Sequence, residues 1–238
     1  MSDFKYIGSE LELFAAARNW KSYWSRQLRP FVSGDVLEVG AGIGANTLFL
    51  DRAVDRGQWV CLEPDPQLGA ELIRNLQDAQ DSKKYEFVCG TIQNLEAGRR
   101  FDTIVYIDVL EHIESDSDEL CAAASHLRPG GCVIVLSPAH QRLFTPFDSA
   151  IGHYRRYNRS MLRKCSPPTL ELEHLRYLDS VGLFASAANR LLLRQSMPTK
   201  AQLQVWDKWM IPLSAVLDSL LWYSLGKSIV GVWRRPGT

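Results

Sequence analysis

Five short apolar runs, separated by segments long enough for helices, constrain the fold of this 238-residue chain most strongly. Each run is apolar nearly throughout, as is typical of parallel strands that are buried on both faces. The runs lie at 35–40, 58–63, 85–89, 101–108 and 132–138, and the helix-length segments between them at 44–54, 66–80 and 114–127. ArgProGlyGly at 128–131 is expected to end the last of these helices. The alternation predicts an α/β fold with a doubly wound, mostly parallel sheet.

The ends of the chain add helices and two further strands. Apolar residues at three- and four-residue spacings predict an N-terminal helical cap over residues 1–29, which Pro30 ends. Strands are expected at 170–180 and 228–233, so the predicted sheet has seven strands. The stretch 183–226 between them is too long for a simple connection and has helical spacing. We therefore predict a core of residues 30–182 and 227–238 that carries a helical insertion at 183–226.

Composition excludes several classes of protein. Apolar residues make up 46% of the chain and charged residues 23%, as in an ordinary globular protein, so a disordered or collagen-like chain is excluded. The five cysteines form no CxxC pair and no zinc motif, and Cys61, Cys89 and Cys132, which lie in apolar runs, are expected to be buried reduced thiols. No His, Cys, Asp and Glu cluster has metal-ligand spacing, so no metal is expected. No segment resembles a signal peptide or a transmembrane helix, and a cytoplasmic protein is expected.

The zero net charge hides an asymmetry between the two halves of the chain. Residues 1–119 contain 12 Lys/Arg and 21 Asp/Glu, whereas residues 120–238 contain 15 Lys/Arg and 6 Asp/Glu. Such a split is compatible with a face that meets anions and with a solvated surface that has no partner. Nucleic acid is not expected, because the chain shows no added binding module and no overall positive charge.

A glycine-rich turn follows the first apolar run directly. Gly40, Gly42 and Gly44 form a GxGxG pattern ahead of a helical stretch, and glycines allow the backbone to approach a ligand closely. Glu38, two residues before the turn, is predicted to bind a cofactor together with the glycines. Glu63 ends the second run, 21 residues beyond Gly42, where a carboxylate can accept two hydrogen bonds from a ribose diol. A dinucleotide-binding GxGxxG turn has different spacing, which disfavours a nicotinamide dehydrogenase.

The fourth run ends at Asp108, at the edge of the sheet where open α/β folds bind ligands. The side chain could face a cationic group there, or it could cap the helix that follows. His112, which comes shortly after, is interpreted as a packing residue, and His126 and His174 have no partner pattern.

Taken in order, EVGAGIG, LEP, DVLEHI and LRPGG resemble the class I S-adenosylmethionine-dependent methyltransferases. The match extends over roughly residues 30–140 and implies a Rossmann-like methyltransferase fold. It implies that Gly40, Ala41 and Gly42 cradle the methionine part of the cofactor, that Glu63, with Pro64 beside it, holds the ribose hydroxyls, and that Asp108 and Val109 line the methionine amino end. The implied cofactor is S-adenosyl-L-methionine, with S-adenosyl-L-homocysteine as its product.

One motif departs from that family. Many members have an acid after the third strand that binds the adenine amine, whereas this chain has CysGlyThrIleGln at 89–93. Thr91 and Ile92, which follow Gly90, would then hold adenine through a hydroxyl or backbone contact and through apolar packing. Gly90 is predicted to lie in the same part of the cofactor site.

The segment 140–157 follows the fifth run and is expected at the ligand-binding edge. It resembles a segment of a bacterial methyltransferase branch often associated with polysaccharide, glycolipid or secondary-metabolite biosynthesis. His153, oriented by Asp148, is the predicted catalytic base, and His140 is a second candidate. Tyr154, Arg155 and Arg156 are predicted to bind the acceptor, since paired arginines suit a carboxylate or phosphate. The alternative is a loop tied down by its own hydrogen bonds.

Helical spacing in 203–225 collects apolar residues on one face, and Pro212 is expected in the first turn of a second helix. This face would pack on the core, form a homodimer or lie on a membrane surface.

The sequence thus predicts an S-adenosylmethionine-dependent methyltransferase that acts at a hydroxyl oxygen of a small-molecule, sugar or lipid-linked acceptor, for which an anionic group is one alternative. The alternative is a non-catalytic cofactor-binding scaffold or regulatory subunit, which would need the same glycines and acids but no acceptor loop. The expected location is the cytoplasm, with peripheral contact at the inner membrane face.

Overall fold

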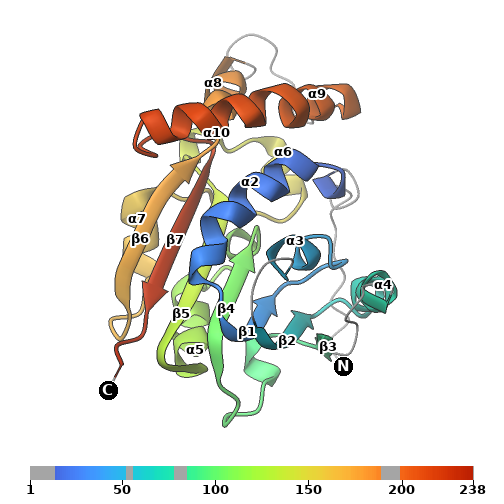
Figure 1. The fold of residues 1–238 in the computed structure, drawn as a ribbon, viewed down its shortest axis with the longest axis vertical. Helices are drawn as coiled ribbons and strands as arrows, with labels where there is room; N and C mark the ends of the chain where they lie inside the picture. Colours follow the sequence, from blue (N-terminus) through green and yellow to red (C-terminus); the bar gives the residue numbers. More distant parts are fainter. Residues whose placement is uncertain (1–13, 52–55, 78–84, 189–198, 238) are drawn as a thin grey trace.

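A seven-stranded sheet forms the centre of the molecule (Figure 1). The structure is a computed structural model, and it describes residues 14–51, 56–77, 85–188 and 199–237. The strand order is β3-β2-β1-β4-β5-β7-β6. β7 runs antiparallel to both of its neighbours, and the other paired strands are parallel. The strands are β1 (Gly34–Val39), β2 (Arg56–Glu63), β3 (Tyr85–Cys89), β4 (Phe101–Ile107), β5 (Leu127–Pro138), β6 (Glu171–Leu178) and β7 (Ser228–Arg234). The predicted doubly wound, mostly parallel sheet is confirmed.

Helices cover both faces of the sheet. One hydrophobic cluster joins it to α2 (Arg18–Leu28), α3 (Thr47–Asp51), α4 (Pro66–Gln77) and α10 (Ile211–Leu220). The other joins it to α5 (Asp116–Ser125) and α7 (Arg159–Cys165). Neighbouring residues of one strand enter different clusters, as Val36 and Leu37 do in β1. Burial on both faces explains why the strand sequences are apolar throughout.

Several boundaries differ from those predicted. β5 begins at Leu127, so ArgProGlyGly lies within the strand, because Leu127 already pairs with Phe101 before an irregularity in the register. Cys89 is exposed rather than buried, since it ends the edge strand β3. Residues 1–13, 52–54, 78–80 and 189–198, for which helix was predicted, lie outside the described residues.

The late helices lie beyond the carboxyl ends of the central strands (Figure 1). They are α8 (Ser180–Ala188), α9 (Lys200–Val205), the π-helical η7 (Trp206–Met210) and α10, in whose first turn Pro212 lies as predicted. Asp218 of α10 is fully buried and fixes them to the core. Its Oδ2 accepts hydrogen bonds from the Tyr23 hydroxyl and the Asp179 amide, both at 2.7 Å.

Shorter elements connect these parts. The 3₁₀ turns are η1 (Arg29–Phe31), η3 (Ile92–Asn94), η4 (Leu110–His112) and η5 (Gln141–Leu143), and α6 spans Pro146–Ala150.

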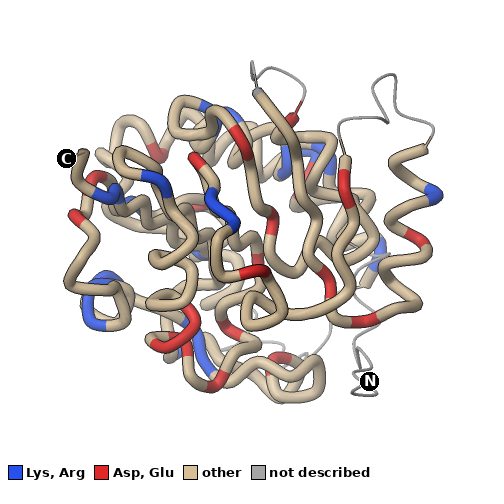
Figure 2. The backbone as a smooth tube through the Cα atoms, turned by 90° about the horizontal axis from the view of Figure 1, so that it is seen from below, with Lys and Arg blue, Asp and Glu red and all other residues tan. Residues whose placement is uncertain are grey.

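Charges of the two halves of the sequence meet in the fold. Arg128 pairs with Asp35 at 2.8 Å and with Asp102 at 2.5 Å, and Arg155 pairs with Asp116 at 2.5 Å. Basic and acidic segments are interspersed along the backbone in Figure 2. The charge asymmetry of the sequence therefore does not gather into a single basic face in that view.

Candidate functional site

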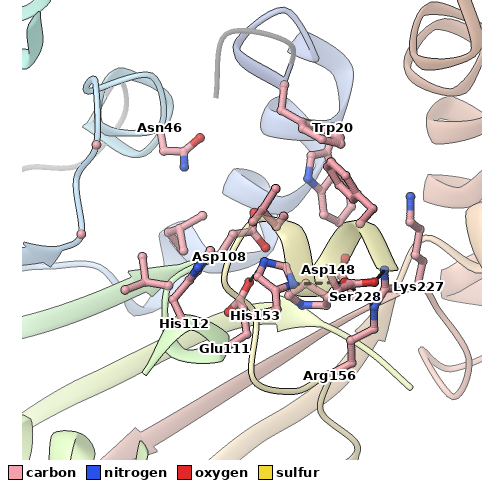
Figure 3. A pocket seen from close by; sticks show the side chains of 18 of the residues that line it. Trp20, Asn46, Asp108, Glu111, His112, Asp148, His153, Arg156, Lys227 and Ser228 are labelled. Atoms are coloured by element: carbon pink, nitrogen blue, oxygen red, sulfur yellow. Dashed lines mark hydrogen bonds and ion pairs between the residues drawn. The ribbon is translucent and has the colours of Figure 1, made fainter. Parts of the chain in front are cut away.

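A cavity of about 1420 Å³ opens at the carboxyl ends of β1, β2 and β4. The sheet edge forms its floor, and residues of α2, α8, α9 and η7 line it from above. Figure 3 shows polar side chains from β4–η4, the α6 region and the start of β7 pointing into one space. The strands thus bring residues from most of the chain to one ligand-sized space, at the edge where open α/β sheets bind ligands.

The glycine turn forms one wall of the cavity. Gly40, Ala41 and Gly42 line it, and the amides of Gly40 and Ala41 donate to the Leu62 carbonyl at 2.8 and 3.1 Å. Gly40 has a φ of 66°, and a Cβ at this position would lie 2.6 Å from a methyl group of Val109. Glycine is therefore required where the end of β1 approaches the end of β4.

Glu63 lies at the cavity wall, where β2 ends. Its Oε2 accepts a hydrogen bond from the Gly42 amide and its Oε1 one from the Asp65 amide, both at 2.9 Å. Burial raises the pKa of Glu63, and these two hydrogen bonds oppose the rise. Each oxygen keeps a further lone pair, so the carboxylate can also accept hydrogen bonds from a bound diol.

Glu38, a predicted cofactor-binding residue, does not line the cavity. It is buried beneath the glycine turn and accepts a hydrogen bond from Trp59 Nε1 at 3.0 Å. Burial raises the pKa of Glu38 to about 7, against hydrogen bonds from Thr47 and Trp59. The structure thus places Glu38 behind the turn, where it supports the wall rather than contacting a ligand.

Asp108 opens into the cavity directly after β4. It adopts a φ of 54°, which is unusual for a residue other than glycine and is often found at functional sites. Although Asp108 is exposed in the open cavity, desolvation by the surrounding protein raises its pKa to about 6, while His153, Lys21 and Lys227 favour the charged form. The predicted alternative, a helix cap, is wrong: Val109 occupies the cap position of η4 and makes no side-chain cap bond.

The predicted adenine residues separate in the structure. Pro64, Gly90 and Thr91 line the cavity, whereas Ile92 is 1% exposed and packs in the core below. The Thr91 hydroxyl lies 2.8 Å from Gln93 Oε1, and Gln93 also lines the cavity. Ile92 is therefore misassigned as a contact residue, because the 3₁₀ turn η3 directs it inward.

At the opposite end of the cavity, Asp148 organises the predicted catalytic loop. Its carboxylate accepts hydrogen bonds from His153 Nδ1 at 3.1 Å, from Arg156 Nε and Nη2 at 2.8 and 2.9 Å, and from the Thr145 amide at 2.7 Å. Burial alone would raise the pKa of Asp148, but the bonds from His153, Arg156 and Thr145 hold it well below its usual range. The arrangement leaves Nε2 of His153 directed away from Asp148.

Three other predicted residues of this loop lie elsewhere. His140 Nε2 bonds to the Gly226 carbonyl at 2.9 Å and its ring stacks on Tyr177, so the prediction of His140 at the reaction centre is wrong. Arg155 is held by Asp116 and by the Glu114 carbonyl. Tyr154 is 52% exposed and does not line the cavity. Only Arg156 of the predicted acceptor-binding residues reaches the cavity, and Asp148 already binds it.

Lys21, Glu111, His112 and Lys227 also line the cavity, although the sequence did not predict them as site residues. Lys21 Nζ donates to the Ala45 carbonyl at 3.0 Å, and burial lowers its pKa to about 8 against the pull of Asp108 and Glu38. Burial also lowers the pKa of Lys227. Both lysines come from elements outside the recognised motifs, so nothing in those motifs could indicate them.

Glu111 and His112 follow Asp108 in η4. Burial raises the pKa of Glu111 well above its usual range, with the negative charge of Asp108 adding to the effect. Burial and the nearby His153 lower the pKa of His112 to about 4. Ligand atoms of Glu111, His112 and His153 lie within 4.8 Å of one another, so these three side chains could hold a metal ion that the sequence spacing did not indicate.

Residues 36–131 match a family model described as a methyltransferase domain. A demethylmenaquinone methyltransferase of Tropheryma whipplei (strain Twist) is 28% identical over 154 residues, which are 63% of this chain and 58% of that protein. The chain thus spans less than two thirds of the length of this curated relative.

Solved structures share the fold at low sequence identity. A geranyl diphosphate methyltransferase in complex with SAM has a TM-score of 0.64 at 12% identity, with 96% of this chain and 90% of that one covered. The [4+2]-cyclase SpnF has a TM-score of 0.63 at 14% identity, with 92% and 81% covered. One fold therefore carries proteins named for different reactions, and activity has to be argued from the site.

Proposed function

We propose that this chain, whose residues 36–131 match a methyltransferase domain, is a class I methyltransferase that transfers a methyl group from S-adenosylmethionine to a hydroxyl oxygen of a largely apolar, lipid-linked acceptor. The observation that supports this most is a single cavity with two differently built ends. The Gly40–Gly42 turn and Glu63 form one end. His153, Asp148 and Arg156 form the other.

The chemistry of the first end fits the cofactor. Glu63 offers a carboxylate to a ribose diol, and Asp108 offers a carboxylate to an ammonium group. The positive charge of Lys21 favours the ionised form of Asp108 that this contact needs. The backbone of Gly40 and Gly42 lines the cavity, and neither residue has a side chain that would stand between the turn and a ligand. When bound, the cofactor supplies an electrophilic methyl carbon, whose bond to sulfur breaks as the acceptor oxygen bonds to it, the electron pair remaining on sulfur.

The protein's own contribution is alignment, exclusion of water and removal of the hydroxyl proton. The wall between the two ends is largely apolar and includes Trp20, Trp24, Phe144, Phe147, Trp206 and Met210. An apolar acceptor is held there by burial of its surface. Its hydroxyl would lie at the polar end, beside His153, where the proton can leave.

The late helices support a lipid-linked acceptor. Trp209, Leu213, Val216 and Leu220 recur along one face of η7 and α10, and their side chains are between 51% and 67% exposed. Val205, one turn earlier, is exposed and also lines the cavity. This apolar stripe therefore extends from the cavity wall outward.

The charges on these helices favour an anionic membrane surface as the partner of the stripe. Lys200 and Lys208 are exposed, whereas the two acids of the same helices face inward. Asp207 accepts a hydrogen bond from the Trp20 amide at 2.9 Å, and Asp218 is buried. Across the described ranges, no helix is both long enough and apolar enough to cross a bilayer. Contact through the stripe would be peripheral.

We expect the full-length protein to bind S-adenosylhomocysteine with one site per chain and to transfer labelled methyl groups from S-adenosylmethionine into the organic phase of a bacterial lipid extract. Calorimetry measures the binding and scintillation counting measures the transfer. The Glu63→Ala variant is the control for transfer that depends on the cavity. Binding without transfer to lipid or polar extracts would instead support the non-catalytic scaffold.

The protein is also expected to co-sediment with vesicles that contain anionic phosphatidylglycerol at low salt, and less so at high salt. Each lysine near such a surface contributes about 1 kcal/mol, and salt screens this attraction. Trp209 fluorescence should shift to shorter wavelength on contact. Leu213→Asn combined with Leu220→Asn should abolish the binding, whereas Leu172→Asn, an exposed position on β6, should not. Self-association in place of vesicle binding would identify the stripe as a homodimer surface.

A further inference from the structure

Three side chains with metal-binding atoms gather at the acceptor end of the cavity (Figure 3). Glu111 and His112 lie in η4, directly after β4, and His153 follows α6. One carboxylate oxygen and one nitrogen of each ring lie within 4.8 Å of one another. The two imidazole rings meet edge to face, with centroids 4.4 Å apart.

The carboxylate of Glu111 is incompletely satisfied. The residue is fully buried, and its Oε2 accepts a hydrogen bond from the Ser137 hydroxyl at 2.9 Å. Its Oε1 is buried without a hydrogen-bond partner in the described part of the chain, and His153 Nε2 lies 4.0 Å away, beyond hydrogen-bond distance. An unpaired buried carboxylate oxygen is costly, and a cation beside it would remove that cost.

The surroundings already orient both histidines. Nδ1 of His153 bonds to Asp148, which Arg156 and Thr145 hold in turn, so Nε2 is left for another partner. The ring of His112 is hydrogen-bonded to the backbone of Ile151. Histidines that bind metals usually use their second ring nitrogen in this way, to a carboxylate or a backbone carbonyl.

We propose that Glu111, His112 and His153 bind one divalent transition-metal ion, and that a hydroxyl oxygen of the acceptor completes its coordination. Two imidazoles and a carboxylate suit Zn²⁺, Co²⁺ or Mn²⁺. Ligand atoms about 2.1 Å from one ion lie roughly 3–3.5 Å from each other. The 4.0 Å between Glu111 Oε1 and His153 Nε2 must therefore shorten by roughly 0.5–1 Å on binding, and no pair in the cluster, whose atoms all lie within 4.8 Å, by more than about 1.8 Å.

The open positions of such an ion face the cavity, because the three protein ligands approach from η4 and the segment after α6. The role for the acceptor rests on the proposed function. An ion lowers the pKa of a hydroxyl that it binds, and the proton leaves to water as the oxygen binds the ion. The geometry therefore favours acceptors with an acidic hydroxyl, such as a phenol or an enol. His153 would act as a ligand, with Asp148 as its positioning residue.

The test uses the full-length protein freed of metal with EDTA and then titrated with Co²⁺, whose visible absorption reports its ligands. We expect one Co²⁺ per chain, displaced by Zn²⁺ in calorimetry. Glu111→Gln keeps the shape and one acceptor oxygen but loses the charge, and it should weaken binding at least tenfold, as should His112→Gln. His174→Gln, a half-buried histidine of β6 outside the cavity, is the matched control and should bind normally.

Equal Co²⁺ binding by the wild type, Glu111→Gln and His112→Gln would overturn the proposal, and so would the absence of saturable binding. S-adenosylhomocysteine binding, measured on the same samples, checks that each variant is folded. It also separates the two proposals: metal binding that fails while the cofactor product still binds refutes the ion site alone, whereas failure of the cofactor product to bind refutes the methyltransferase function.

Discussion

Replacing His153 with alanine is expected to lower turnover by about 10²–10⁴-fold while S-adenosylhomocysteine affinity is retained. This is the usual contribution of a residue that assists proton transfer, and His153 lies at the end of the cavity away from Glu63. The loss is expected whether the imidazole takes the proton itself or holds an ion that acidifies the hydroxyl. Steady-state kinetics with labelled methyl donor measure it.

The matched control for this experiment is His174→Ala, which removes a histidine outside the cavity. Added imidazole distinguishes the two routes to proton removal, because it can replace a missing base in solution without rebuilding a metal site. Unchanged turnover in His153→Ala would return the Asp148–His153 pair to a purely structural role in the loop.

Replacing Glu63 with alanine is expected to weaken binding of S-adenosylmethionine at least tenfold. Hydrogen bonds to a charged group contribute about 1.5–3 kcal/mol each, and a tenfold change corresponds to about 1.4 kcal/mol. Glu63→Gln keeps an oxygen for the Gly42 or Asp65 amide and should lose less. Glu173→Ala, which removes an exposed carboxylate of β6 paired with Arg234, serves as the control.

The pH dependence gives a second measure of the same role. Burial raises the pKa of Glu63, and the ribose hydroxyls bind its ionised form best. Affinity should therefore be complete well above that raised pKa and should fall as the pH is lowered through it, beginning at a higher pH than for an ordinary glutamate. Calorimetry as a function of pH checks this, and the dependence should disappear in Glu63→Gln. An affinity in Glu63→Ala equal to that of the wild type would exclude Glu63 from the site.

The cofactor end of the cavity could be predicted because its chemistry is local. Gly40 and Gly42 are required by the backbone of one turn, and Glu63 is placed by the end of one strand. Ile92 shows the limit of this reasoning. Its position next to Thr91 predicted a contact, but the turn of η3 directs its side chain into the core.

The acceptor end could be predicted only in part. The sequence indicated the pair Asp148 and His153, which are close neighbours in the chain. It favoured His153 over His140 but kept His140 as a candidate, because excluding His140 depends on its backbone, where a φ of 66° accompanies the stacking of its ring on Tyr177. Nor did it indicate Glu111 and His112 as neighbours of His153, since the packing of η4 against the segment after α6 brings them together.

The sequence by itself determined the sheet and the glycine turn, because strands buried on both faces require continuous apolar runs and a sharp turn requires glycine. The tertiary structure decided which polar side chains share the cavity and which merely tie the chain down. Arg155 and Arg156 are adjacent and chemically identical, yet one pairs with Asp116 outside the cavity and the other with Asp148 inside it. Such differences arise from contacts between segments far apart in the sequence, and no local pattern records them.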